Sequence, residues 1–417
     1  MRTLFVIFLI TLLSNTTVGQ TTAIPDVNFE QELINLGFDG VLDGQVLTAN
    51  IDTLTSLNVV VSSISDLTGI EDFIALTFLN CIGNQLTNLN VVQNINLTTL
   101  WCNNNLITNL DVTQNINLTN FSCGANQLSS LDVTQNTSLV ELQCGYTTLT
   151  SLDVTQNPNL TRLHCQWSNL SNIDLSQNTQ LIYLYINNNQ LSSLNLTLNT
   201  SLYWLYASVN QITSLDLSQN ILLADVRCNS NQLVSINTSG ANSLSVLSCY
   251  SNLLTELNIA SNTLMTSLNC YDNNLSCLNV KNGNNSSFSY FSALSNPNLT
   301  CIDVDNVAWS TANWTNIDAQ TSFSTNCGNP CAVGINENNL FNLSLYPNPT
   351  TGSFTIDLGE TKQDIKATLI NGLGQVVYSK EIASTNSFTI ELDSPKGFYF
   401  LRLETQGDVI TKKIIKE

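Results

Sequence analysis

The chain has 417 residues, of which only 10% are charged, so Asn, Ser and Thr must carry much of its polar surface. Its 12 basic and 31 acidic residues give a net charge of −19. This balance argues against nucleic acid or an anionic membrane as a partner, because both need a patch of Lys and Arg. The length exceeds that of one compact core and suits a stack of repeats followed by a second domain.

Residues 1–19 predict a secretory signal peptide. Arg2 supplies the positive charge, and residues 4–13 form a short apolar run. Thr17 and Gly19 offer a small-residue cleavage site. The apolar run is too short to span a bilayer, and no cysteine follows it to carry a lipid anchor. We therefore expect an exported protein without membrane insertion.

Residues 20–50 predict an N-terminal helical cap. An amphipathic helix starts near Asp26 and stops at Gly37. Its apolar side consists of Phe29, Leu33 and Leu36. Because the end of a repeat stack exposes a strand edge, such a helix would cover it.

Residues 51–304 repeat with a period of 21 residues, as in the step from Cys81 to Cys102. The frame L-x-x-L-x-C-x-x-N-x-L-x-x-L-D-V-T-x-N runs from Leu76 to about Val280. The cysteine position holds Cys81, Cys102, Cys123, Cys144, Cys165, Ile186, Ala207, Cys228, Cys249 and Cys270. A single unit cannot bury its apolar face, so we expect the units to stack around one continuous core.

The run around each cysteine alternates as a strand does. Leu100 and Cys102 would face the core and Trp101 would face outward, with neighbouring strands about 4.8 Å apart. The Asn three residues later, such as Asn105, turns the chain inward, and its amide can satisfy backbone groups at the bend.

This frame, with L-x-x-L-x-[LC]-x-x-N as its signature, resembles the leucine-rich-repeat family. It is similar to a 21-residue bacterial class whose second half echoes its first, as Leu86 and Asn94 echo Leu76 and Asn84. The resemblance covers roughly residues 50–304. It implies a β-rich repeat solenoid with a parallel sheet on a concave face that binds other molecules, and it does not imply catalysis.

The stacked cysteines are expected to be buried free thiols that act as small apolar residues. Parallel side chains at strand spacing do not suit a disulfide, whose Cβ atoms lie about 3.8 Å apart. A metal–thiolate ladder is the weaker alternative, because nothing closes such a site on four sides.

The C-terminal cap is predicted at residues 305–327, where Trp309, Trp314 and Phe323 can cover the last coil. The cysteines off the ladder are Cys277, Cys301, Cys327 and Cys331. Three pairings are open to them. We favour Cys301 with Cys327, because that bond would join the cap to the last coil.

Outward residues beside the cysteines are the candidates for ligand binding. They are Trp101, Arg162, His164, Trp167, Tyr183, Tyr185, Trp204, Tyr206, Arg227, Tyr250 and Tyr271. Exposed Trp and Tyr are typical of binding hot spots and can stack on sugars, although aromatic residues also simply favour exposed strands. His164 is the sole histidine, so no catalytic triad or His-based metal site can assemble. We predict neither enzymatic activity nor a cofactor.

A second row of side chains repeats on the opposite half of the coils: Asp111, Asp132, Asp153 and Asp174. Stacked carboxylates repel one another, and Ca²⁺ would relieve this repulsion. The favoured interpretation is a solvated row that hydrogen-bonds to the adjacent Thr and Ser residues.

After a linker at residues 328–340, residues 341–417 predict a small antiparallel β-sandwich. The expected strands are 354–358, 365–370, 375–378, 388–392, 398–403 and 409–414. The segment LYPNPTTGSFTIDL from Leu345 and the terminal KKIIKE resemble the C-terminal sorting domain of the type IX secretion system. The residues that match that family's pattern are Pro347, Asn348, Pro349, Lys412, Lys413 and Lys416. The resemblance implies a Gram-negative bacterium, contact with the secretion machinery, export through the outer membrane and removal of the tail.

Together these features predict a secreted or cell-surface adhesion protein that holds a protein or glycan on its concave face. The alternative is a structural spacer or surface coat without a defined ligand.

Overall fold

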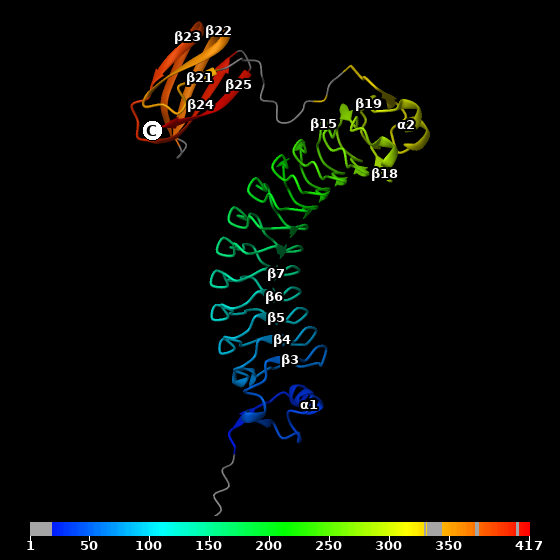
Figure 1. Ribbon diagram of the computed structural model, residues 1–417, viewed down its shortest axis with the longest axis vertical. Helices are drawn as coiled ribbons and strands as arrows, with labels where there is room; N and C mark the ends of the chain where they lie inside the picture. Colours follow the sequence, from blue (N-terminus) through cyan, green and yellow to red (C-terminus); the bar gives the residue numbers. More distant parts are fainter. Residues whose placement is uncertain (1–18, 329–330, 332–343, 372–374, 406–407) are drawn as a thin grey trace, which may run out of the picture. The chain divides into compact units, whose positions relative to one another are not determined.

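The computed structural model describes residues 19–328, 331, 344–371, 375–405 and 408–417 (Figure 1). The chain divides into two compact units, Met1–Gly334 and Ile335–Glu417. The predicted signal peptide, except Gly19, and most of the predicted linker lie outside the described residues. Within the described part of the chain, no helix has the length and apolar content needed to cross a membrane.

A short helix, α1 (Val27–Asn35), forms near the N-terminal end of the first unit. It begins after Asp26, whose carboxylate accepts a hydrogen bond from the backbone N–H of Phe29 at 3.0 Å. Phe29 and Leu33 are buried in the core as expected. Leu36 is not: it is 44% exposed, because the helix ends at Asn35 and Leu36 caps it instead of continuing the apolar side.

The concave sheet of the solenoid is a twelve-stranded parallel sheet, which lies along the inner side of the curved row of coils (Figure 1). Its strands are β3 (Ser56–Asn58), β4 (Phe78–Asn80), β5 (Thr99–Trp101), β6 (Asn120–Ser122), β7 (Glu141–Gln143), β8 (Arg162–His164), β9 (Tyr183–Tyr185), β10 (Trp204–Tyr206), β12 (Asp225–Arg227), β14 (Val246–Ser248), β16 (Ser267–Asn269) and β18 (Tyr290–Ser292). The pairing of Leu79 with Leu100 is one repeat step, and the pairing of Leu57 with Leu79 is the longer first step. The predicted leucine-rich-repeat solenoid is confirmed.

The remaining elements of the first unit are shorter or lie in smaller sheets. An antiparallel pair is formed by β1 (Thr21–Ala23) and β2 (Gln45–Leu47). Parallel strands in the second half of the coils are β11 (Ser214–Asp216), β13 (Ser235–Asn237), β15 (Glu256–Asn258), β17 (Cys277–Asn279), β19 (Cys301–Asp303) and β20 (Ser322–Ser324). The 3₁₀ turns are η1 (Thr48–Asn50), η2 (Ile70–Asp72) and η3 (Asn285–Ser287).

The ladder cysteines form part of the core. All eight are buried free thiols, and burial raises the pKa of Cys144 to about 12. The Cys102 thiol donates to the backbone oxygen of Ser122 at 3.4 Å. The ladder therefore consists of neutral, small, apolar side chains, as expected.

Two rows of buried asparagines join neighbouring coils. In the row after the cysteines, Asn126 donates to the backbone oxygens of Cys102 and Cys123 at 3.0 and 2.9 Å and accepts from the N–H of Ile107 at 3.0 Å. In the second row, Asn136 donates to the backbone oxygens of Val112 and Asn115 at 2.9 Å each. The Oδ1 atom of Asn136 meets no donor among the described residues.

An aromatic stack closes the C-terminal end of the solenoid after helix α2 (Val307–Asn313). Trp314 is 5% exposed and stacks on Phe291 with 4.0 Å between ring centroids. Trp309 and Phe323 contact Trp314 at 5.7 and 5.9 Å. Disulfides join Cys301 to Cys327, the pairing favoured above, and Cys277 to Cys331.

The second unit is one antiparallel sheet of five strands: β21 (Ser344–Tyr346), β22 (Ser353–Asn371), β23 (Val376–Glu391), β24 (Gly397–Thr405) and β25 (Asp408–Lys416). The antiparallel β-module is confirmed, with fewer and longer strands than expected. The sequence predicts two strands separated by the polar residues 359–364. In the structure these residues remain extended within β22, and the pairing with β23 shifts register between Asp357 and Lys362.

Candidate functional site: the concave face

The first and third residues of each concave strand carry the outward side chains, because the middle residue is buried in the core. On β9 the middle residue Leu184 is fully buried, whereas Tyr183 and Tyr185 are partly exposed. Since the register between coils is in step, outward residues of neighbouring strands stand side by side. Trp204 and Tyr206 on β10 thus pair with Tyr183 and Tyr185.

We call His164, Tyr183, Tyr185, Trp204 and Tyr206 the aromatic cluster. Tyr185 lies at its centre, with ring centroids 4.3 Å from His164 and 4.9 Å from Tyr206. Tyr183 meets Trp204 edge to face at 5.2 Å. The separations of Tyr185 from Tyr206 and of Tyr183 from Trp204 fall in the range of favourable aromatic pairs, and that of His164 from Tyr185 is slightly shorter. Five of the predicted residues therefore form one continuous aromatic surface.

Two arginines flank the aromatic cluster, and each has an acidic partner. Arg162 lies 3.5 Å from Glu141 and over the ring of Tyr183 at 5.2 Å. Arg227 lies 3.1 Å from Asp225 and over the ring of Tyr206 at 4.6 Å. Half-exposed ion pairs contribute little stability, so their main effect is to orient the guanidinium groups against the rings.

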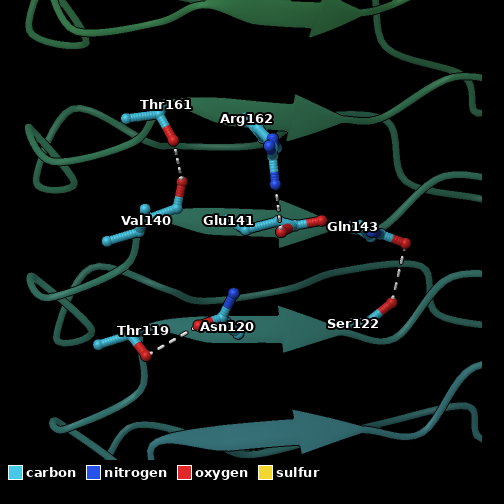
Figure 2. A network of polar contacts seen from close by, with 8 residues as sticks. All are labelled: Thr119, Asn120, Ser122, Val140, Glu141, Gln143, Thr161 and Arg162. Carbon is cyan, nitrogen blue, oxygen red and sulfur yellow. Dashed lines mark hydrogen bonds and ion pairs between the residues drawn. The ribbon is translucent and has the colours of Figure 1, made fainter.

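Polar side chains continue the face towards the N-terminal coils (Figure 2). Gln143 donates to Glu141 at 2.6 Å on β7, and Ser122 on β6 donates to Gln143 at 3.2 Å. Figure 2 shows these groups lying across β6 to β8, with Arg162 reaching Glu141. The planar amide, carboxylate and guanidinium groups beside the aromatic cluster are therefore held in place before any ligand arrives.

Burial favours the uncharged forms of His164, Tyr185 and Tyr206 in the aromatic cluster. Burial lowers the pKa of His164; the nearby Arg162 adds to this shift and Glu141 opposes it. Burial also raises the pKa of Tyr185 and of Tyr206 above the usual value. The charged groups beside these rings are paired with each other, Arg162 with Glu141 and Arg227 with Asp225.

The other predicted residues lie outside the aromatic cluster. Trp101 contacts Phe78 at 5.3 Å on β4 and β5. Tyr250 and Tyr271 follow buried cysteines, just beyond the ends of β14 and β16. Trp167 lies in a turn past β8.

Among the described residues of the solenoid, the sequence analysis left out the exposed or partly exposed aromatic residues Phe78, Tyr146, Tyr203 and Tyr290. Phe78 and Tyr290 occupy regular outward positions that the repeat frame marks. Tyr146 occupies the turn that follows each ladder position, and its ring stacks on Trp167 at 5.9 Å. The signal that could have found it is the same step of 21 residues that separates Tyr146 from Trp167.

The aspartate row is hydrogen-bonded within its own turns. Asp111 accepts from the N–H and hydroxyl of Thr113 at 2.9 and 2.7 Å, and these bonds lower the pKa of Asp111. Asp132 and Asp153 repeat the arrangement. Among the described residues, no three His, Cys, Asp or Glu side chains gather as a metal site would require.

The two ends of the sorting motif meet in the second unit. Asn348 accepts a hydrogen bond from the N–H of Ile415 at 2.9 Å, and the N–H of Thr350 donates to Ile415 at 2.8 Å. The ammonium of Lys416 donates to the backbone oxygens of Leu392 and Ser394 at 2.6 Å each. The side chain of the predicted Lys413 lies outside the described part of the chain.

Comparison with known proteins supports both units. The family model of the secretion system C-terminal sorting domain matches residues 344–417. No curated protein matches the chain.

Three solved structures resemble the chain. An internalin (InlF) from Listeria monocytogenes is 19% identical over 71% of this chain and 95% of its own, with a TM-score of 0.54. A leucine-rich-repeat protein of Leptospira interrogans is 21% identical over 66% of this chain and 80% of its own, with a TM-score of 0.54. The functional domain of InlJ from Listeria monocytogenes, described as including a cysteine ladder, is 26% identical over 96% of this chain and 99% of its own, with a TM-score of 0.48.

The stacked coils and the parallel concave sheet define a leucine-rich-repeat solenoid. The chain is a leucine-rich-repeat solenoid protein with a C-terminal sorting domain of the type IX secretion system. It is therefore secreted, or displayed on the outer surface of a Gram-negative bacterium.

Proposed function

We propose that this chain is a secreted or cell-surface binding and adhesion protein that holds its ligand on the concave face. The observation that carries the proposal is the aromatic cluster, in which Tyr185 contacts both His164 and Tyr206 while remaining partly exposed. Large amphipathic rings in mutual contact are the usual centre of a binding surface.

The rigidity of the sheet favours this function. Each outward ring stands on a strand that is hydrogen-bonded to a neighbouring coil on both sides, as Tyr185 is between β8 and β10. Little conformational entropy is lost when such a surface binds, since it is ordered beforehand. The aromatic residues also gather on β8 to β10, whereas the outward positions of β14 and β16 hold Val246, Ser248, Ser267 and Asn269.

The alternative is a spacer or surface coat without a defined ligand, in which the rings only stabilise the sheet as cross-strand pairs. Concentration of the rings on a few coils favours binding over this alternative. We propose no catalytic role: His164 stacks on Tyr185, and the thiols of the cysteine ladder are buried.

The N-terminal and C-terminal segments of the chain would direct its export. We propose that residues 1–19 are removed as a signal peptide and that residues 341–417 contact the secretion machinery. The second unit would then be cleaved, which releases the solenoid or transfers it to the cell surface.

An array of purified oligosaccharides and extracellular proteins, probed with the full chain, tests the binding function. The matched variants are Tyr185→Ala in the aromatic cluster and Ile116→Ala, which changes an exposed apolar residue in a turn outside the concave sheet. Binding to an array component that Tyr185→Ala reduces and Ile116→Ala preserves is the expected result. Binding that survives Tyr185→Ala and Trp204→Ala unchanged would contradict the concave-face function.

A further inference from the structure

Two aromatic residues occupy turns where the backbone disfavours them. Tyr146 and Trp167 have φ of +58° and +55°, in the left-handed region that bulky side chains avoid. The same turn also has a positive φ in the other coils, where it holds Val61, Gly83, Asn104, Ala125, Asn188, Val209, Ser230, Ser251, Asp272 and Ser295. The positive φ is therefore a property of the repeat, and these two coils are distinguished by the large aromatic side chains that they place at this position.

The two turns differ from the others in further ways. The row of buried asparagines is interrupted here by Thr147 and Ser168, whose hydroxyls contact each other at 3.0 Å. Gly145 has no side chain where a Cβ atom would lie 2.6 Å from the backbone oxygen of Gln166. The close approach of these turns therefore requires glycine, and it lets Tyr146 stack on Trp167 at 5.9 Å with both rings about half exposed.

The aromatic residues form an oblique line across the concave face. Tyr146 and Trp167 lie past the ends of β7 and β8, His164 and Tyr185 end β8 and β9, and Trp204 begins β10. Strand spacing and rise per residue make this line roughly 20 Å long. We call it the aromatic track: Tyr146, Trp167, His164, Tyr183, Tyr185, Trp204 and Tyr206.

The polar groups beside the aromatic track are balanced in charge and suited to hydroxyl groups. Arg162 is paired with Glu141, and Arg227 with Asp225. Planar amide, carboxylate and guanidinium groups can each bind neighbouring hydroxyls with two hydrogen bonds.

No aliphatic side chain occupies the first or third position of β7 to β12. This part of the face therefore lacks the aliphatic surface that would bind Leu or Ile side chains of a protein partner. Rings that present flat faces, flanked by paired charges, fit the apolar C–H faces and hydroxyl rims of sugars.

We propose that a neutral, linear oligosaccharide binds obliquely along the aromatic track, from Tyr146 and Trp167 to Trp204. The proposal rests on the concave-face function and specifies its ligand. The ring of Trp167, carried by this turn, then extends the stacking surface beyond the sheet.

The turn provides a variant that separates binding from folding. Trp167→Asn places at this position the residue found in two other coils, Asn104 and Asn188, and it relieves the strain. We expect this variant to melt no lower than the natural chain, and to bind oligosaccharide about tenfold more weakly. Ile116→Ala removes an exposed apolar side chain from a turn outside the concave sheet and should leave affinity within about twofold.

The experiment is calorimetric titration of the full chain with neutral oligosaccharides of increasing length, with uronate-containing counterparts and peptides as the other arms. Affinity for the neutral series should rise with length until the track is filled, and should change little with salt because the charges are paired. Unchanged affinity in Trp167→Asn, or binding restricted to peptides or to uronates, would overturn the proposal. Peptide binding lost in Tyr185→Ala would preserve the concave-face function, whereas binding indifferent to Tyr185 would refute both.

Discussion

The imidazole of His164 stacks on the ring of Tyr185, with 4.3 Å between centroids and 26° between planes. The contact joins β8 to β9 and places the only histidine of the chain within an aromatic surface. It therefore makes the stability of the concave face sensitive to the protonation of one residue.

Protonation of His164 should destabilise the solenoid. Burial lowers the pKa of His164 in the folded chain, so the unfolded chain takes up this proton at higher pH, near the ordinary value of about 6.5. The free energy of unfolding should thus fall as pH drops from about 7 towards 5. Thermal melting of His164→Gln should lack this component, and identical pH profiles in the two proteins would contradict the account. The carboxylates act in a separate window: hydrogen bonds from Thr155 lower the pKa of Asp153, so its contribution is lost only below pH ~4.

The ladder thiols should be unreactive in the folded protein. Burial raises the pKa of Cys81 and Cys228 to about 12, so neither the thiolate nor access for a reagent is available. A thiol-specific chromogenic reagent should detect almost none in native buffer and eight thiols after denaturation without reductant. Rapid native reaction, or a different number of thiols in the denatured chain, would show that the ladder or the disulfides are assigned wrongly.

The two asparagine rows should differ in their contribution to stability. Asn126 both donates to and accepts from backbone groups, whereas Asn136 only donates. Each buried backbone group left unpaired costs about 1–3 kcal/mol. Asn126→Ala should therefore lower the urea midpoint more than Asn136→Ala does, and the reverse order would contradict the hydrogen-bond assignment.

Lys416 should be needed for a stable sorting domain. Its ammonium donates to Leu392 and Ser394, and Lys416→Met would leave both carbonyls without that partner. In a bacterium with the type IX system, we expect Lys416→Met to reduce the exported fraction relative to the exposed-surface control Lys380→Met. Equal export of both variants would show that this contact is dispensable.

The repeat made most of the fold, and the outward placement of the central candidate residues, predictable from sequence. Once Cys165 and Ile186 are assigned to the core, His164 and Tyr185 must face outward on adjacent strands. The turn residue Tyr146 was missed because alternation says nothing about a side chain placed by a positive φ. The extent of β22 was missed because its polar middle carries no apolar alternation, so hydrogen bonding to β23 alone keeps it extended.

Binding by the concave face is tested most directly by the dissociation constants of single variants for one array-identified ligand. Tyr185→Ala should weaken binding by about tenfold or more, because it removes the central ring of the aromatic cluster. Asp132→Asn, in the exposed aspartate row outside the concave sheet, should leave the constant within about twofold. Wild-type affinity in Tyr185→Ala, or an equal loss in Asp132→Asn, would contradict the assignment of ligand binding to the concave face.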